Sequence, residues 1–474
     1  MKNNIRNLCV LMLLIMPIVP SAHAQTPARE QLKRLLAAVN SGDRPTLEQY
    51  AKASLSPNYK DSLSVDDALT MHKFTGGLDV LELTDVAPNL VKGWVRTRDS
   101  DAVMELAVEV EKEAPHRLEF FKVSWGTTPP KYYPPRLTEA AAIEAARVEA
   151  ARRTAVGKFS GALLVARGNT ILLREAYGLA DRNKNIPNAT DTRFRTASTS
   201  KMFTAVAILR LVQDGKLKLD DPIGRIVPAL AGKPVAHATI QQLLTHTSGT
   251  ADIYGPRLDE HQDKLLVHDD FVNLFGGDAL LFDPGTKYEY SNLGYIFLGA
   301  AIEHASGRSY YDYIQDSVFT PAGMTHSDIP PKDVAMDGRA SGYYRPPGTR
   351  EWLPASKFLD YRGDGAGGAW STVDDLARFL GALRANRLLN EKYTKLMLTP
   401  MEQVWPGRQF CAGVFLESYP GASVRVGHSG AESGSNSEAW FMPDSGYVVI
   451  VMSNLDQDTA TQVAGFIEAR LPVR

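Results

Sequence analysis

The sequence predicts an α+β fold, an α/β sandwich in which one antiparallel sheet is flanked by helices. Five short segments have the alternating or β-branched pattern of strands: 161–167, 170–177, 423–427, 438–442 and 447–453. The first two are joined by Gly168-Asn169, which favours a hairpin. The stretch 198–398 between the two groups is mostly helical, with loops rich in glycine and proline. Strands on both sides of a helical region predict one sheet assembled from distant parts of the chain, with a helical subdomain inserted.

A separate pattern precedes this sheet. Apolar residues recur at helical spacing in three segments, 29–39, 47–53 and 65–72. Segments of extended character follow at 78–86, 90–98, 102–110 and 118–123. Helices followed by a meander of strands predict a small α+β domain over residues 25–126. Its order resembles the NTF2-like family in architecture alone, because no motif supports the comparison.

A proline-rich segment separates the two patterns. Four prolines between Gly126 and Pro135 favour a stiff, extended linker at residues 127–136. A surface loop inside one domain is the alternative interpretation. An alanine-rich helix is expected at 138–153, so the second domain is expected to span 137–474.

Residues 1–24 have the pattern of a cleavable signal peptide. Lys2 and Arg6 precede a short apolar run from Leu8 to Val19, and Ala22-His23-Ala24 fits the small-x-small cleavage pattern. The run is too short to span a bilayer well. We expect export, to the periplasm or outside the cell, with no stable membrane span after cleavage. A retained N-terminal anchor is the alternative.

The composition excludes several functional classes. The 474 residues include 52 basic and 54 acidic side chains, a formal charge of −2, so charge favours neither nucleic acid nor an anionic membrane as a partner. The two cysteines, Cys9 and Cys411, are too few for a disulfide-rich scaffold or a cysteine-rich metal site. We expect neither a metal nor an organic cofactor, and the oligomeric state stays open.

The motif Ser198-Thr-Ser-Lys201 stands just before the apolar helical stretch 202–212 and is the only Ser-x-x-Lys in the chain. Residues three apart on a helix share a face. A serine in the first turn lies in the positive field of the helix N-terminus, which favours its alkoxide. A lysine one turn later accepts the serine proton if burial lowers its pKa. Taken alone, the motif also fits an N-cap serine and a solvated lysine.

Two further motifs are unique in the chain. Tyr290-Ser291-Asn292 is the only Tyr-x-Asn. A tyrosine near an ammonium group can have a lowered pKa and act as a proton shuttle, and an asparagine amide can bind a substrate. A capped helix and a packed Tyr290 would explain the same residues. His428-Ser429-Gly430 is the only His-x-Gly and follows the β segment 423–427, where a plain turn between strands is the alternative.

Longer segments surround the motifs: Phe194-Arg-Thr-Ala-Ser-Thr-Ser-Lys201, Ile240-Gln-Gln-Leu-Leu-Thr-His-Thr-Ser-Gly249, Pro284-Gly-Thr-Lys-Tyr-Glu-Tyr-Ser-Asn292 and Gly367-Gly-Ala-Trp-Ser-Thr-Val-Asp-Asp-Leu376. On these segments, the chain from about Thr138 onward resembles the serine β-lactamase and penicillin-binding protein superfamily. It is most similar to the class C-like branch, with its related esterases and D-amino-acid peptidases. The resemblance implies a β-lactamase/transpeptidase-like fold and does not cover residues 25–126.

The resemblance also implies a role for each matching residue. Ser198 is expected to be the acylated nucleophile, with Lys201 and Tyr290 sharing the general-base and general-acid work. Asn292 is expected to bind a substrate amide. The backbone N–H groups of Ser198 and Ala431 are expected to hold the oxyanion.

His428 and Gly430 complete the expected substrate-binding strand. His428 stands where β-lactamases of this kind usually carry the lysine of a Lys-Thr-Gly triplet, which fixes a substrate carboxylate. A histidine is mostly neutral at pH 7, so recognition of a β-lactam carboxylate is not expected from it. His246, in the second of the longer segments, is expected to be a hydrogen-bonded loop histidine.

These observations predict an exported serine hydrolase that forms an acyl-enzyme with an ester, amide, peptide or lactam. Its substrate is expected to be a small molecule or a peptide, with esterase or peptidase activity favoured. A true β-lactamase or D-alanyl-D-alanine carboxypeptidase is the first alternative. A cell-wall binding or sensor protein without turnover is the second.

Overall fold

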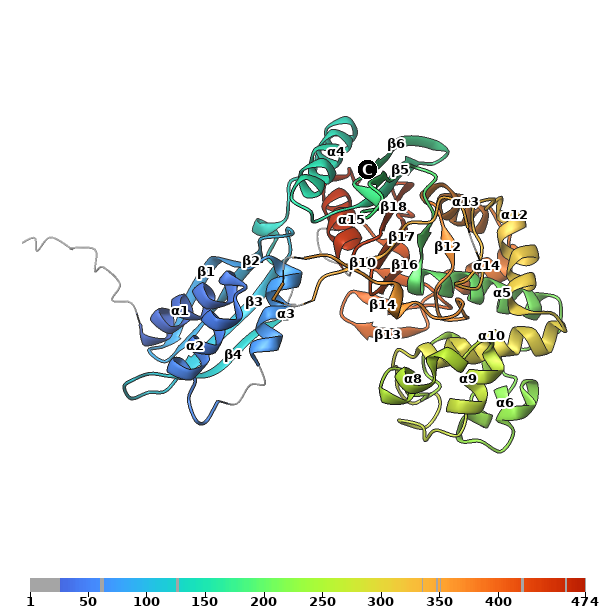
Figure 1. Ribbon diagram of the computed structural model, residues 1–474, viewed down its shortest axis with the longest axis horizontal. Helices are drawn as coiled ribbons and strands as arrows, with labels where there is room; N and C mark the ends of the chain where they lie inside the picture. Colours follow the sequence, from blue (N-terminus) through green and yellow to red (C-terminus); the bar gives the residue numbers. More distant parts are fainter. Residues whose placement is uncertain are drawn as a thin grey trace, which may run out of the picture.

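The computed structural model describes residues 26–59, 64–124, 128–334, 336–346, 348–349, 351–418, 422–456 and 458–473. The predicted signal peptide, residues 1–24, lies outside the described residues. Among the described helices, none combines the length and the apolar character that a membrane crossing needs. Figure 1 shows a small N-terminal unit beside a larger C-terminal unit that contains the long sheet.

The N-terminal unit, residues 26–124, is a four-stranded antiparallel meander covered by helices (Figure 1). Its elements are α1 (Pro27–Ser41), α2 (Arg44–Ser54), α3 (Val65–Thr75), β1 (Leu78–Ala87), β2 (Leu90–Thr97), β3 (Val103–Val110) and β4 (Leu118–Ser124). The side chains of Thr26, Asp43 and Ser64 cap the three helix starts. Leu32 of α1 packs with Val91 and Val108 of the sheet in a core of its own. The order of helices and strands is the predicted one.

An eight-stranded antiparallel sheet forms the centre of the C-terminal unit, in the order β13-β14-β15-β16-β17-β18-β5-β6. Its strands are β5 (Gly161–Arg167), β6 (Thr170–Tyr177), β13 (Glu402–Trp405), β14 (Arg408–Phe410), β15 (Phe415–Glu417), β16 (Arg425–Glu432), β17 (Ser435–Phe441) and β18 (Tyr447–Ser453). The early strand β5 pairs with the late strand β18, from Gly161 opposite Ser453 to Arg167 opposite Tyr447. The prediction of one sheet built from both ends of the chain is therefore confirmed.

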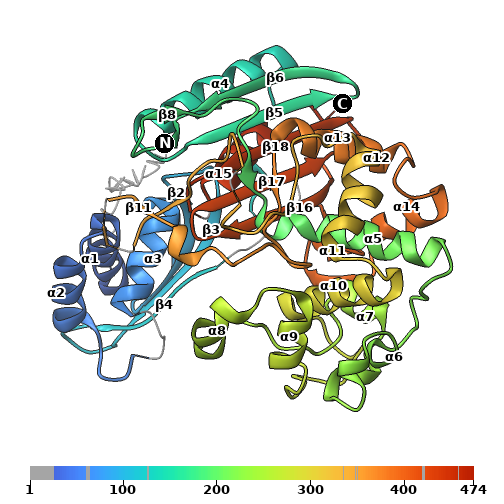
Figure 2. The same ribbon diagram turned by 45° about the vertical axis from the view of Figure 1, so that its right-hand side comes forward.

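Helices cover both faces of this sheet (Figure 2). The helices of the C-terminal unit, of which α6, α8 and α9 lie away from the sheet beyond α10 (Figures 1 and 2), are α4 (Glu139–Ala155), α5 (Lys201–Gln213), α6 (Ile223–Ile226), α7 (Ile240–Leu244), α8 (Pro256–His261), α9 (His268–Phe275), α10 (Asn292–Ser306), α11 (Tyr310–Ile314), α12 (Thr320–Ala322), α13 (Val373–Arg384), α14 (Glu391–Leu398) and α15 (Thr459–Arg470). Leu163 and Val449 face the core under α4 and α15, whereas Leu164 and Ile450 face the core that contains α5, α10 and α13. Because both faces are buried, β5 and β18 are apolar runs without alternation.

Short strand pairs complete the C-terminal unit: β7 (Leu179–Asp181) with β8 (Ile186–Pro187), β9 (Phe194–Arg195) with β12 (Trp370–Ser371), and β10 (Tyr343–Tyr344) with β11 (Leu353–Pro354). In both views the β10–β11 hairpin extends from the C-terminal unit toward α3 (Figures 1 and 2). At its tip, a Cβ placed on Gly348 would lie 3.5 Å from Leu69 of α3. The hairpin therefore touches the N-terminal unit.

The structure corrects two sequence-based expectations in the sheet. The strand expected to end at Gly427 continues to Glu432, and Ser429, Gly430 and Ala431 are paired with β17. His428 therefore lies inside a strand rather than in a turn. The strands β13, β14 and β15 at one end of the sheet were not predicted, because each has only three or four residues and polar and apolar residues are mixed in them.

One buried carboxylate joins three separate segments where the two units meet. Asp456 is 6% exposed, and its Oδ2 lies 2.8 Å from Nζ of Lys73 in α3. The same oxygen accepts the Arg345 N–H at 2.9 Å, just after β10. The other oxygen, Oδ1, accepts the Gly434 N–H at 3.0 Å, in the turn between β16 and β17. The N-terminal unit, the β10–β11 hairpin and the end of β16 are therefore linked through Asp456.

Replacing Asp456 by alanine is expected to lower the free energy of unfolding by about 2–4 kcal/mol, because one ammonium and two backbone N–H groups lose a buried acceptor. Urea denaturation followed by far-ultraviolet circular dichroism measures the change. Asp333→Ala, at an exposed position, is the matched control and is expected to cost under about 0.5 kcal/mol. Equal unfolding midpoints for the two variants would contradict the assigned role of Asp456.

Candidate active site

The turn that carries Ser198 is a short 3₁₀ helix, Ala197–Ser200, which leads directly into α5. Ala197 has a φ of 44°, in the left-handed region that residues with side chains rarely adopt. Gly367 packs against it: a Cβ there would lie 3.3 Å from the Ala197 carbonyl oxygen. The turn places Ser198 Oγ 3.1 Å from Lys201 Nζ, so the predicted pairing of these two residues is present.

Lys201 is completely buried, with 0% exposure. Burial lowers the pKa of its ammonium to about 7, although the carboxylates of Asp364 and Asp252 oppose the shift. Nζ lies 2.7 Å from both Asn292 Oδ1 and the Ala366 carbonyl oxygen. A neutral amine donates its two N–H groups to these oxygens, which leaves its lone pair directed toward Ser198 Oγ. The geometry therefore suits a base near neutral pH.

Tyr290 lies over Lys201, whose Nζ is 4.9 Å from the ring centroid, and its hydroxyl is hydrogen-bonded to Ser198. Burial raises the pKa of Tyr290 well above its usual value, a direction that the hydrogen bond with Ser198 opposes but does not reverse. The lowered pKa considered from the sequence is wrong, because desolvation outweighs the neighbouring amine. Tyr290 is therefore a protonated hydroxyl that can pass a proton on.

His246 supports Tyr290 from behind. The two ring centroids are 4.3 Å apart, and Nδ1 of His246 accepts the Ser291 N–H at 3.1 Å. Burial lowers the pKa of His246 well below its usual value, so the ring is neutral. As expected from the sequence, it is a hydrogen-bonded loop histidine, and it holds the loop that carries Tyr290 and Asn292.

Gly430 lets strand β16 approach the Ser198 turn. A Cβ at this position would overlap the Thr196 carbonyl oxygen and would lie 3.0 Å from the Ser198 nitrogen. Ser437, opposite Gly430 in β17, donates from its hydroxyl to the same Thr196 oxygen at 2.7 Å. This contact brings the backbone of Gly430 and Ala431 beside the Ser198 N–H, as an oxyanion hole requires.

Replacing Gly430 by alanine is expected to lower kcat/KM by about 10²–10³-fold, because the methyl group pushes β16 away from the Ser198 N–H. Steady-state kinetics with a chromogenic ester measures the loss. Gly465→Ala is the control, because a Cβ at that α15 position meets no atom within 4 Å and alanine favours helix. Wild-type kinetics for Gly430→Ala would show that the close approach is dispensable.

His428 is buried and neutral. Its side chain is 1% exposed, and burial together with the Lys201 charge lowers its pKa to about 3. Nδ1 lies 2.5 Å from the Ser429 carbonyl oxygen, which only accepts, so Nδ1 carries the proton. No hydrogen-bond partner of Nε2 is found among the described residues. His428 therefore presents a lone pair, not a cation, at the place of the β-lactamase lysine.

The structure adds residues that the motifs did not reveal. Asp252 accepts hydrogen bonds from both the backbone and side-chain nitrogens of Asn292, at 3.2 Å each. Asp364 is hydrogen-bonded to the N–H groups of Ala366 and Gly367 and holds the loop that contacts Lys201. The glycine-rich composition of this loop was visible in the sequence. The contact between Asp252 and Asn292 joins segments 40 residues apart, so no local sequence pattern predicts it.

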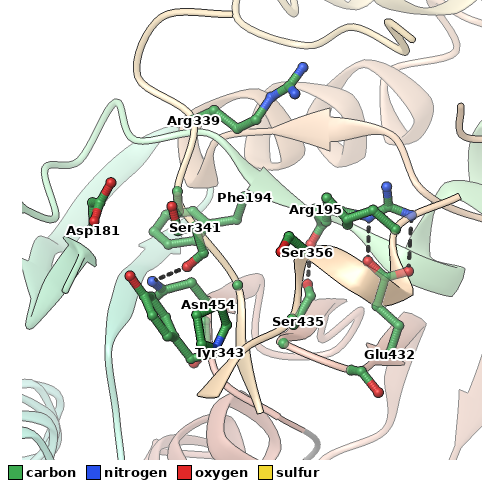
Figure 3. A pocket seen from close by; sticks show the side chains of 18 of the residues that line it. Asp181, Phe194, Arg195, Arg339, Ser341, Tyr343, Ser356, Glu432, Ser435 and Asn454 are labelled. Carbon is green, nitrogen blue, oxygen red and sulfur yellow. Dashed lines mark hydrogen bonds and ion pairs between the residues drawn. The ribbon is translucent and has the colours of Figure 1, made fainter. Parts of the chain in front are cut away.

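A cavity of about 300 Å³ lies beside the reacting groups rather than on them. Figure 3 shows that Arg195 and Glu432 form one wall and that Tyr343 and Asn454 lie across from them. Arg195 is 7% exposed and is paired with Glu432 through two nitrogens. Arg195 lies in β9, just before the turn that carries Ser198, and Glu432 directly follows Ala431 in β16. Since both residues line the cavity, it borders the candidate active site.

Comparisons with known proteins agree with this geometry. The family model described as Beta-lactamase matches residues 145–471. Penicillin-binding protein 4* of Bacillus subtilis is 32% identical over 326 residues, which are 65% of this chain and 70% of that protein. The crystal structure of a penicillin binding protein from Bacillus halodurans is 32% identical, covers 69% of this chain and 98% of that chain, and has a TM-score of 0.61.

A D-amino acid amidase from Ochrobactrum anthropi has the same fold, at 27% identity over 69% of this chain and 97% of that chain, with a TM-score of 0.57. The family match spans the eight-stranded sheet and all the candidate residues described above. The chain therefore belongs to the β-lactamase family, within the serine β-lactamase and penicillin-binding protein superfamily, and is a serine hydrolase.

Proposed function

We propose that Ser198 is the nucleophile of this hydrolase and forms an acyl-enzyme, with Lys201 as its base. The observation that carries the proposal is the state of the Lys201 amine. It is fully buried, its two N–H groups face carbonyl oxygens, and its nitrogen lies 3.1 Å from Ser198 Oγ. A lysine arranged in this way is a base and not a surface charge.

In the acylation step, Ser198 Oγ attacks the substrate carbonyl carbon while its proton moves to Nζ of Lys201. The carbonyl oxygen gains the negative charge and is held by the N–H groups of Ser198 and Ala431. The carbon–leaving-group bond then breaks, and the leaving group takes a proton through the Tyr290 hydroxyl, which Lys201 replenishes. Water attacks the resulting ester by the reverse proton path and releases the acid.

Asn292 has two roles in this proposal. Its Oδ1 accepts a hydrogen bond from Lys201 and fixes the amine, while its Nδ2 donates to Asp252 at 3.2 Å. A substrate amide carbonyl that enters beside Asp252 would compete for the same Nδ2–H donors. The side chain thereby couples substrate binding to the position of the base.

Esters, amides and small peptides are the favoured substrates, ahead of β-lactams. β-Lactams carry a carboxylate that an ammonium group in the Lys-Thr-Gly position would bind, and His428 offers a neutral ring there. The resemblance to penicillin-binding proteins and to a D-amino acid amidase supports amide and peptide substrates. The composition of residues 1–24 supports export to the periplasm or the medium.

Hydrolysis of a p-nitrophenyl ester and of an amino acid p-nitroanilide by the wild type and by Ser198→Ala tests this proposal. Turnover of either substrate by the wild type alone is the expected result. Turnover that survives in the variant would refute the assignment of Ser198. A chromogenic cephalosporin in the same assay decides the alternative: turnover faster than that of the ester and anilide would favour a β-lactamase.

A further inference from the structure

The loop of residues 363–368 holds Lys201, and the loop is itself held by a buried histidine behind the active site. The Ala366 carbonyl oxygen accepts a hydrogen bond from Lys201 Nζ at 2.7 Å. The N–H of Gly365, the residue just before it, donates to Nε2 of His268 at 3.1 Å. One residue therefore separates the oxygen that holds the amine from the contact with His268.

His268 is the first residue of α9, and its side chain has no exposed surface. Because the Gly365 N–H only donates, Nε2 of the ring presents its lone pair and Nδ1 carries the proton. Nδ1 lies 3.3 Å from Oε2 of Glu303 in α10. A carboxylate beside Nδ1 fixes both the orientation of the ring and the tautomer that can accept at Nε2.

Tyr310 closes a network of side chains around Gly365. Its backbone N–H donates to the second Glu303 oxygen, Oε1, at 3.0 Å, and its ring centroid lies 4.8 Å from that of His268. Its hydroxyl is hydrogen-bonded to Thr204 Oγ1 at 2.8 Å, and Thr204 donates to the Gly365 carbonyl oxygen at 2.7 Å. The N–H and the carbonyl of Gly365 are therefore both held by the same network.

Two glycines leave the space that this contact needs. A Cβ on Gly299 of α10 would lie 2.2 Å from Nε2 of His268. A Cβ on Gly365 would lie 2.2 Å from the Tyr295 carbonyl oxygen, which also belongs to α10. The ring thus reaches the loop at a place where helix, ring and loop are in close contact, and a small shift of one moves the others.

We propose that His268 is a positioning residue for Lys201. By fixing the loop 363–368, it keeps the Ala366 carbonyl oxygen within hydrogen-bond distance of the amine. The proposal rests on the proposed role of Lys201 as the base that activates Ser198. Since the ring is buried behind the loop, we expect it to act on the rate of acylation and not on the binding of a substrate.

Two amide variants separate this role from a merely structural one. The side chain in His268→Gln is long enough to place an oxygen near the position of Nε2, where it accepts the Gly365 N–H. The shorter side chain in His268→Asn reaches only the position of Nδ1, so the N–H loses its acceptor. Intact-mass kinetics with a fluorophosphonate measure the result, because the concentration dependence separates the binding constant from the maximal rate of Ser198 modification.

At pH 7 we expect His268→Asn to lower the maximal rate by about 10–100-fold and His268→Gln to stay within about 3-fold of the wild type. The binding constant is expected to stay unchanged in both variants. His237→Asn, at an exposed position, is the matched control and is expected to react at the wild-type rate.

The pH profile of the same reaction is the second measurement. Burial lowers the pKa of Lys201 to about 7, so the wild-type rate is expected to rise with a midpoint near this pH. A loosened loop lets water reach Nζ and stabilise the ammonium form. We therefore expect His268→Asn to raise the midpoint by about half a unit or more and His268→Gln to leave it in place. Asp252 and Asp364, whose charges act on Lys201, are unchanged in both variants.

Equal rates and equal midpoints for the two variants, whether at the wild-type level or below it, would overturn the proposal and leave His268 a packing role alone. The ¹⁵N NMR signals of histidine-labelled wild type keep the test decisive if His268→Asn does not fold. The signals of His268 are those missing from His268→Gln, and we expect a proton on Nδ1; a proton on Nε2 would also overturn the proposal. A wild type that does not react with the fluorophosphonate would instead overturn the proposed function.

Discussion

Replacing Ser198 by alanine is expected to reduce turnover of every substrate by at least about 10⁴-fold, to the background rate. The Lys201 amine and the oxyanion donors cannot form an acyl-enzyme without the hydroxyl that becomes acylated. Steady-state kinetics with the ester and anilide, and single-turnover experiments at excess enzyme, measure the loss. An unchanged dissociation constant for a bound reaction product, measured by calorimetry, would show that binding survives.

Two controls separate chemistry from folding in this experiment. The Ser198 side chain is half-buried and its loss leaves no large cavity, so the melting temperature is expected to stay within a few degrees. Ser306→Ala, at the end of α10, removes a serine hydroxyl far from Lys201 and is expected to retain activity. A Ser198→Ala enzyme that is folded and still active would contradict the account of the nucleophile.

Replacing Lys201 by methionine is expected to lower the acylation rate by about 10²–10⁴-fold, which is the contribution typical of a positioned general base. Methionine is similar in length and is tolerated in a buried position. The hydroxyl of Ser198 stays in place, so slow residual phosphonylation is expected, unlike in Ser198→Ala. Lys33→Met, at an exposed position in α1, is the control. Acylation at the wild-type rate by Lys201→Met would assign the base to another group.

The pH dependence of the wild type checks the same residue. Burial lowers the pKa of Lys201 to about 7, so the amine is protonated and inactive as a base below this pH and neutral above it. The acylation rate is therefore expected to rise with pH and to level off above about 7. The burial of His246 and His428 keeps both rings neutral in this range, so their titration does not produce the rise. In the Lys201→Met variant, the rise of the acylation rate with pH is expected to disappear.

The local parts of the site could be predicted from the sequence. Ser198 and Lys201 are three residues apart on one helical turn, so their meeting follows from helix geometry alone. The unique Tyr290 and His428 motifs indicated which distant segments belong with them. Asp252 and Asp364 could not be found in this way, because a lone aspartate in a loop has no periodic or spacing signal.

The two wrong predictions, for the pKa of Tyr290 and for the end of β16, have the same physical cause: contacts that only the tertiary structure supplies. The sequence allowed a lowered pKa for Tyr290 from its neighbouring amine, whereas the packed site desolvates the phenol and raises it. The strand was expected to end at Gly427, but pairing with β17 extends β16 to Glu432. In both cases, contacts from other segments override a local preference.

The measurement that tests the central claim most directly is the intact mass of the protein after reaction with a fluorophosphonate, followed by peptide mapping. We expect one adduct on the wild type, mapped to Ser198, and none on Ser198→Ala. An unmodified wild type, or an adduct mapped to any other residue, would contradict the claim that Lys201 activates Ser198.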